Sequence, residues 1–238
     1  MNMLCIFCES KFEAQQLLTK LNDYKIVTDY LFNIYEIKLN GKDIILVQAG
    51  EGKVNFAYAM GVITEKYPIT AVIGFGNCGY IGKQKKDLGD IAISDMVFQY
   101  DVDFQANHYR LFEIPGTNQV VFPSDLHLKQ FALMACKYLD YKGQVGLFGT
   151  ADRFINSSII SEHLNQSYRI EFIDVEAAVL GQVAYRHHLP FICVKAISHY
   201  GDDDAFQTFK QAFQAANERS SDVVYTMLEA MTRKGVYC

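Results

Sequence analysis

The chain has no excess of positive charge. Its 238 residues carry 22 Lys and Arg against 27 Asp and Glu, a formal net charge of −5, and both signs are scattered along the sequence. A surface that binds nucleic acid needs a clustered basic face. We therefore expect a small-molecule partner and no nucleic acid.

Long hydrophobic runs are also missing near the start of the chain. The apolar segment Met3–Cys8 is short and leads at once into Glu9, Lys11 and Glu13. A membrane-spanning helix needs about 20 consecutive apolar residues, and a signal peptide has a different pattern of charges. We expect no membrane partner and a cytoplasmic protein.

The six cysteines do not form a clear metal-binding or disulfide pattern. Cys5 and Cys8 match the C-x-x-C spacing, but residues three apart on an extended strand point to opposite faces, and no second pair exists. The histidine pair 187–188 and the aspartate run 202–204 resemble solvated surface segments more than metal ligands. We expect no metal and no cofactor.

What the sequence does contain is an alternation of short apolar runs with segments of helical spacing. Half of its residues are apolar, enough for one large domain over residues 1–238. This alternation predicts an α/β sandwich with a mostly parallel sheet, and the turn at 40–43 makes the sheet mixed. Strands are predicted at 3–8, 34–39, 44–49, 71–75, 91–94, 145–148 and 191–198, and helices at 12–21, 54–66, 122–139, 177–186 and 207–232.

The stretch 171–198 is predicted to be a β-α-β unit that carries the active site. Glu176, Lys195 and His199 stand in or at the edge of its apolar runs. A buried charge without a partner costs several kcal/mol, so such residues are usually paired or functional. Open α/β sheets bind ligands at the carboxyl ends of their strands, where these residues fall.

Six sequence segments occur in an order that resembles the purine nucleoside phosphorylase superfamily, and within it the 5′-methylthioadenosine/S-adenosylhomocysteine nucleosidases. They lie at 49–54, 74–79, 88–95, 154–156, 174–178 and 194–198 and span nearly the whole chain. The resemblance implies a three-layer α/β/α sandwich with a central mixed sheet, usually a homodimer, with no metal or cofactor. It also implies an N-ribosyl hydrolase whose small-molecule partner is a purine nucleoside.

The same resemblance implies roles for individual residues. Glu13 would activate the attacking water, Glu176 would hold the ribose hydroxyls, and Lys195 stands where the family has an arginine near that water. Cleaving an N-glycosidic bond builds positive charge on the ribose, and a carboxylate beside the sugar lowers that barrier.

The resemblance also places residues around the substrate. Phe154 would pack on the base, Ile155 would contact it through its backbone, Val175 would lie under the sugar, and Phe206 would close over the substrate. The predicted substrate-binding set is completed by Gly52, Asn77 and Ser198.

The acid that protonates the leaving purine departs from the family pattern. The family has an aspartate where this chain has His199, and a histidine can donate a proton to N7 near neutral pH. Alternatively an aspartate of the 202–204 run takes over, the leaving base has changed, or the site is inactive.

The glycine-rich turns carry no arginine, so a bound phosphate would lack bidentate partners. Asn77 replaces a serine or threonine there, and Glu51 stands where an apolar residue is common. Water is the expected nucleophile, and the expected reaction is hydrolysis to free adenine and a thioribose product. The alternatives are a nucleosidase or phosphorylase for another purine nucleoside and a catalytically inactive nucleoside-binding protein.

Overall fold

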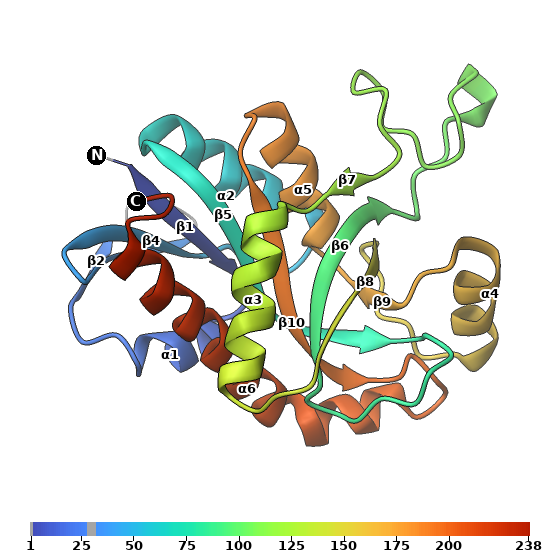
Figure 1. Ribbon diagram of the computed structural model, residues 1–238. Coiled ribbons are helices and arrows are strands. Elements are labelled where there is room, and N and C mark those ends of the chain that lie inside the picture. Colours follow the sequence, from blue (N-terminus) through green and yellow to red (C-terminus); the bar gives the residue numbers. More distant parts are fainter. Residues whose placement is uncertain (1, 28–31) are drawn as a thin grey trace.

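The structure is a computed structural model that describes residues 2–27 and 32–238. Its strands are β1 (Met3–Cys8), β2 (Tyr24–Val27), β3 (Asn33–Leu39), β4 (Lys42–Gln48), β5 (Ile69–Tyr80), β6 (Ile91–Gln99), β7 (Phe122–Pro123), β8 (Gly143–Thr150), β9 (Phe172–Asp174) and β10 (Phe191–His199). The helices are α1 (Lys11–Leu18), α2 (Lys53–Lys66), the short 3₁₀ turn η1 (Gln105–Asn107), α3 (Leu126–Tyr138), α4 (Ser158–Tyr168), α5 (Ala177–Arg186) and α6 (Ala205–Lys234). Figure 1 shows their arrangement.

The strands form one mixed sheet, as the sequence predicted. β1 runs parallel to both β4 and β5, and the antiparallel strands β3 and β2 extend the sheet beyond β4. At the other end the pairings return on themselves: β5 pairs with β10, β10 with β6, β6 with β8, β8 with β9, and β9 with β5. The long strand β5 therefore belongs both to the open part of the sheet and to a closed ring of five strands.

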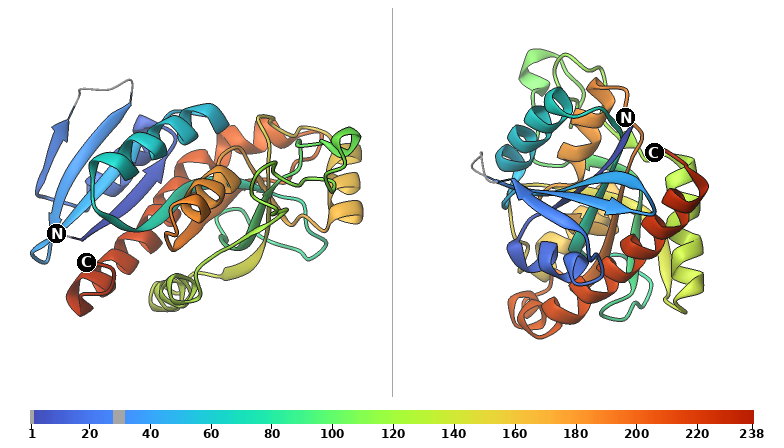
Figure 2. Two further views of the ribbon diagram at one scale, coloured as in Figure 1. Left: turned by 90° about the horizontal axis from the view of Figure 1, so that it is seen from above. Right: turned by 90° about the vertical axis from the view of Figure 1, so that its left-hand side faces the viewer.

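Helices cover both faces of the sheet and complete the predicted three layers. Alternate residues of β1 supply the two cores: Leu4 and Ile6 pack with α1, α3 and α6, whereas Cys5 and Phe7 pack with α2 and α5. Figure 2 shows the sheet between these two groups of helices. Cys8 lies in the first core, opposite to Cys5, and all six cysteines are free. The two thiols therefore cannot act as a pair.

Most predicted elements are present, with three differences. β5 continues through the glycine-rich segment 76–79, whereas the strand was predicted to end at 75. The helix predicted to begin at 122 begins at Leu126, because residues 122–123 pair with β6 and Asp125 caps the helix by accepting from the Leu128 N–H. β2 and α4 were not predicted, and their residues are largely exposed, so the apolar periodicity that marks an element is weak there.

No helix within residues 2–27 and 32–238 has the length and apolar content that crossing a membrane requires.

Candidate functional site

A cavity of about 460 Å³ lies where several strands of the sheet end. Glu9 follows β1, Asn77 and Cys78 lie near the C-terminal end of β5, and His199 is the last residue of β10. This is the sheet edge at which α/β proteins commonly bind ligands. The lining residues are Glu9, Glu51, Gly52, Asn77, Cys78, Asp152, Arg153, Phe154, Ile155, Ile173, Asp174, Val175, Glu176, His199, Phe206 and Phe209.

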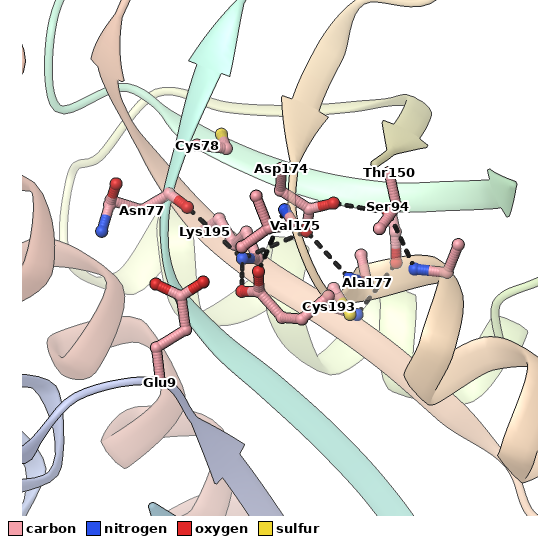
Figure 3. Close-up of polar contacts among 12 residues, drawn as sticks. Glu9, Asn77, Cys78, Ser94, Thr150, Asp174, Val175, Ala177, Cys193 and Lys195 are labelled. Carbon is pink, nitrogen blue, oxygen red and sulfur yellow. Dashed lines mark hydrogen bonds and ion pairs between the residues drawn. The ribbon is translucent and has the colours of Figure 1, made fainter. Parts of the chain in front are cut away.

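A buried ion cluster forms the floor of this cavity (Figure 3). The Lys195 ammonium pairs with the Glu176 carboxylate, lies 3.1 Å from Asp174 Oδ2 and donates to the Asn77 carbonyl oxygen at 3.3 Å. Burial by itself lowers the pKa of Lys195, but the surrounding acids, Asp174 first and Glu9 next, raise it above its ordinary value. Lys195 is therefore a fixed positive charge, paired with Glu176 and Asp174.

Asp174 anchors this cluster to the backbone. Its Oδ1 accepts from the Thr150 hydroxyl at 2.6 Å, and its Oδ2 accepts from the Ala177 N–H at 3.0 Å, at the start of α5. The Thr150 oxygen in turn accepts from the Ala178 N–H at 2.9 Å. Because the helix N-terminus and Thr150 satisfy Asp174, the position of Lys195 and hence of Glu176 is fixed.

Glu13 lies behind the cavity wall and is connected to the cluster through Asn77. Its Oε2 accepts from the backbone N–H groups of Glu9 and Ser10 at 2.8 and 3.0 Å, and the Ser10 hydroxyl accepts from the Glu13 N–H, which makes a capping box. The other carboxylate oxygen accepts from Asn77 Nδ2 at 3.3 Å. Ser198 orients that amide, since its hydroxyl donates to Asn77 Oδ1 at 3.0 Å.

The two carboxylates at this end of the cavity are both shifted toward the protonated form. Burial raises the pKa of Glu13 to about 7, and the charge of Glu9 adds to the shift. Burial also raises the pKa of Glu9 to about 7; Lys195 opposes this shift, whereas Asp174 and Glu51 add to it. Near neutral pH each carboxyl group exchanges protons readily, as a general base must.

His199 stands at the opposite end of the cavity as a neutral ring. The Gly201 N–H donates to its Nδ1 at 3.1 Å, so the uncharged imidazole carries its proton on Nε2. Burial lowers the pKa of His199 to about 4. A Cβ atom on Gly79 would lie 2.4 Å from the imidazole Cε1, so only glycine there leaves room for the ring. At neutral pH His199 offers the site a hydrogen-bond donor but no positive charge.

Aromatic side chains surround this imidazole. The Phe154 ring lies against it with centroids 4.7 Å apart, and the edges of Phe206 and Phe209 face Phe154 at 6.1 and 5.6 Å. The Phe206 N–H donates to Asn156 Oδ1 at 3.0 Å, which ties the start of α6 to the loop that carries Phe154. Phe154 and Phe206 are 44% and 51% exposed. Flat apolar faces are thus available to a heterocycle.

The aspartates of the 202–204 run do not line the cavity. Asp203 accepts from the Ser158 N–H and hydroxyl, and Asp202 accepts from the Asp204 N–H. The alternative in which one of them replaces the family's acid has no support in this geometry.

The structure brings the predicted site residues together in two layers. Those that line the cavity are Gly52, Asn77, Phe154, Ile155, Val175, Glu176, His199 and Phe206. Those that lie behind its wall, joined to it by the contacts above, are Glu13, Lys195 and Ser198. Ser198, predicted to contact substrate, is fully buried and holds Asn77 instead.

The model of the phosphorylase superfamily matches residues 3–229. The chain belongs to the phosphorylase superfamily. The chain is 32% identical to the 5′-methylthioadenosine/S-adenosylhomocysteine nucleosidase of Haemophilus ducreyi, over 91% of this chain and 93% of that protein. The nucleosidase of the same name from Staphylococcus saprophyticus is 29% identical, over 96% of this chain and 100% of that one.

Solved structures of a nucleosidase and of another hydrolase share this fold closely. The 5′-methylthioadenosine/S-adenosylhomocysteine nucleosidase from Neisseria meningitidis, in complex with methylthio-immucillin-A, superposes with a TM-score of 0.91 at 27% identity, covering 97% of this chain and 100% of that chain. The Helicobacter pylori futalosine hydrolase also has a TM-score of 0.91, at 19% identity, over 96% of this chain and 98% of that chain. The architecture predicted from the sequence is therefore confirmed.

Sequence reasoning missed Glu9, Asp174 and Phe209 as site residues. Asp174 belongs to a segment that matches the superfamily, and its position two residues before Glu176 was the available signal. Glu9 looks like one of several charged residues at the start of a helix, and nothing in its spacing marks it. Phe209 follows Phe206 by three residues on α6, a spacing that puts both rings on one face of a helix.

Proposed function

We propose that the protein is a purine nucleosidase that hydrolyses the N-glycosidic bond of 5′-methylthioadenosine or S-adenosylhomocysteine. The observation that carries this proposal is the Glu176 carboxylate, which Lys195 fixes at one end of the cavity floor. His199 and Phe154 lie at the other end of the cavity. A sugar at the first end and a base at the second would place the bond between them within reach of both.

At the sugar end, Glu176 would bind the ribose hydroxyls with Val175 beneath the ring. As the bond to the base lengthens, the ribose gains positive charge, and a carboxylate already held in place stabilises that charge without reorganising. The water would be activated by a carboxyl group on the same side, the role that family resemblance assigns to Glu13. Gly52 and Asn77 line this region.

At the base end, Phe154 and Phe206 would pack on the purine, and the backbone of Ile155 would recognise its edge. His199 would donate its Nε2–H to an acceptor such as N7. Because the pKa of His199 is lowered to about 4, the neutral ring stabilises developing negative charge by a hydrogen bond and leaves net protonation to solvent.

The charge of the cavity supports water as the nucleophile. Five of its lining residues are acidic, Arg153 is the only lysine or arginine among them, and the Lys195 charge behind the floor is already paired with two carboxylates. An incoming phosphate would meet repulsion and no bidentate partner on the floor.

The experiment incubates purified protein with methylthioadenosine, S-adenosylhomocysteine, adenosine and inosine, each with and without phosphate, and measures free base by chromatography. We expect adenine release from the first two substrates, independent of phosphate. Release that requires phosphate would identify a phosphorylase, and binding without release would identify a nucleoside-binding protein.

A nucleosidase for another purine is the second candidate, because of His199. A carboxylate can accept from a 6-amino group and also donate when protonated, whereas the neutral His199 ring with its proton on Nε2 can only donate. Such a donor suits a purine with a hydrogen-bond acceptor beside N7, such as a 6-oxo group. Inosine, which has this group, tests the second candidate.

We further propose a cytoplasmic homodimer. Free cysteines suit a reducing compartment. Large apolar side chains are exposed on α2, where Val54 is 78% and Tyr58 50% exposed, and the cavity residue Gly52 lies directly before this helix. A second copy of the chain would cover them. Light scattering measures the mass, and a monomer at all concentrations would contradict the dimer.

A further inference from the structure

Two side chains of opposite charge line the cavity without a partner for either charge. Glu51 and Arg153 are both exposed to solvent at the cavity. Neither charged group makes a hydrogen bond or an ion pair with a residue in the described ranges, and the two do not pair with each other. The steps proposed above for bond cleavage use neither residue. Both charges therefore remain available to a ligand.

The backbones that carry these two charges are held together. Arg153 directly follows Asp152, and Asp152 Oδ1 accepts from the Lys53 N–H at 2.7 Å, two residues after Glu51. The Glu51 carbonyl oxygen accepts from Asn55 Nδ2 at 2.6 Å, in the first turn of α2. The loop before α2 and the loop after β8 are thus joined at the cavity, and each presents one charge from a fixed backbone.

The charge of Glu51 reaches the end of the cavity proposed for the sugar. It adds to the rise in the pKa of Glu9, whose side chain points toward Asn77 and Lys195 (Figure 3). With the ribose hydroxyls on Glu176 and the base at the other end, the 5′ substituent is the free end of a bound nucleoside. It would extend from the ribose toward the exposed residues of the cavity.

An α-amino acid group has charges that match this pair. Its ammonium group would donate to the Glu51 carboxylate, and its carboxylate would accept two N–H groups of the Arg153 guanidinium. S-adenosylhomocysteine carries such a group at the end of a short chain on its 5′ sulfur. Methylthioadenosine ends there in a methyl group, which can make neither contact.

We propose that Glu51 and Arg153 are specificity-determining residues that bind the amino acid group of S-adenosylhomocysteine and favour it over methylthioadenosine. This inference rests on the proposed nucleosidase function. The contacts lie away from the bond that breaks, so they act on substrate binding and not on the chemical step. Because both charges are exposed, solvent and salt screen each contact, and its effect is modest.

The test measures kcat/KM for both substrates in Glu51→Gln and Arg153→Gln. The matched control is Glu65→Gln, which exchanges an exposed glutamate of α2. We expect each of the first two variants to lower the ratio of kcat/KM for S-adenosylhomocysteine over methylthioadenosine by roughly fivefold, with the change in KM and not in kcat. Glu65→Gln should keep the wild-type ratio, and circular dichroism confirms that each variant is folded.

Two analogues of S-adenosylhomocysteine assign the contacts one by one. One analogue lacks the amino group and the other lacks the carboxyl group. Glu51→Gln should weaken only substrates that keep the amino group, and Arg153→Gln only those that keep the carboxyl group. If both variants keep the wild-type ratio, or if their effects do not depend on these two groups, the assignment is wrong.

Failure of the proposed function gives a different result. A wild-type protein that releases no base from either substrate would overturn the nucleosidase, and calorimetric dissociation constants would then test the two contacts. Tighter binding of S-adenosylhomocysteine than of methylthioadenosine, lost in both variants, would support the assignment. Equal binding of the two nucleosides by the wild type would overturn it.

Discussion

The two ends of the cavity respond to burial in opposite ways. At the end proposed for the sugar, burial raises the pKa of Glu9 and Glu13 to about 7, and at the end proposed for the base it lowers the pKa of His199 to about 4. In all three groups the cause is the same, because a low-dielectric surrounding disfavours the charged form of either sign. On the floor of the cavity, Glu176 pairs with Lys195 in a fixed ion cluster.

This contrast separates groups that can accept or release protons from groups that can only hold charge. The carboxyl groups of Glu9 and Glu13 have pKa values near neutrality and suit a proton acceptor, whereas the neutral imidazole suits a hydrogen-bond donor. Glu176, by contrast, is paired with the fixed positive charge of Lys195. The comparison predicts three separate kinds of mutational effect.

The largest effect should follow from neutralising the fixed charge. Glu176→Gln preserves the shape of the side chain but removes the carboxylate proposed to bind the sugar. We expect kcat to fall by about 10³-fold, the scale for losing a preorganised electrostatic contact. Steady-state release of free base measures it. Near-full activity in this variant would show that the charge does not act on the reaction.

A smaller effect should follow at the base end. His199→Asp exchanges a neutral donor for a group that also accepts, so the ratio of kcat/KM for adenosine-type over inosine-type substrates should rise by roughly tenfold, about 1.4 kcal/mol. Competition between methylthioadenosine and the matching 6-oxo nucleoside measures the ratio directly. An unchanged ratio would mean that His199 does not contact the base.

The smallest effect should appear in stability. The carboxyl groups of Glu9 and Glu13 bind protons more tightly in the folded protein than in the unfolded chain. Their contribution to the free energy of unfolding is therefore full below about pH 4.5 and is lost as the pH rises through about 7. His199 binds its proton less tightly when folded, so its contribution is full above about pH 6.5 and is lost as the pH falls through about 4.

Two variants separate these opposing slopes. In the wild type, the free energy of unfolding should fall by on the order of 1–3 kcal/mol between pH 5 and 8 because of Glu9, and Glu9→Gln should remove this fall. His199→Asn should remove a fall of similar size between pH 6 and 4. Urea unfolding at a series of pH values measures both. If the two variants changed the same limb of the profile, the contrast between the two ends would be wrong.

The sequence predicted ionisable residues inside apolar runs better than those inside charged stretches. Glu176, Lys195 and His199 interrupt apolar runs, and an ionisable residue in such a run has a reason to be there. Glu9 stands in a charged stretch, and only the pairing of β1 between β4 and β5 shows that its side chain enters a cavity. Tertiary placement of a polar segment leaves no mark on its own periodicity.

Two features of the fold also lay beyond the sequence. The ring of strands depends on β9 pairing with β5, a contact between residues 79–80 and 172–173 that neither segment's pattern specifies. The register of β10 shifts against β5 between Ile197 and His199, and such an irregularity re-aims the side chains that follow it. Simple alternation along β10 therefore could not place Ser198 behind the wall.

The most direct test of the account is the origin of the new oxygen on the sugar. Methylthioadenosine is incubated with the protein in water labelled with heavy oxygen, in the presence of phosphate, and the sugar product is analysed by mass spectrometry. We expect one labelled oxygen in the sugar and no sugar phosphate, and we expect Glu176→Gln to release almost no labelled sugar. A sugar phosphate without the label would contradict hydrolysis at this site.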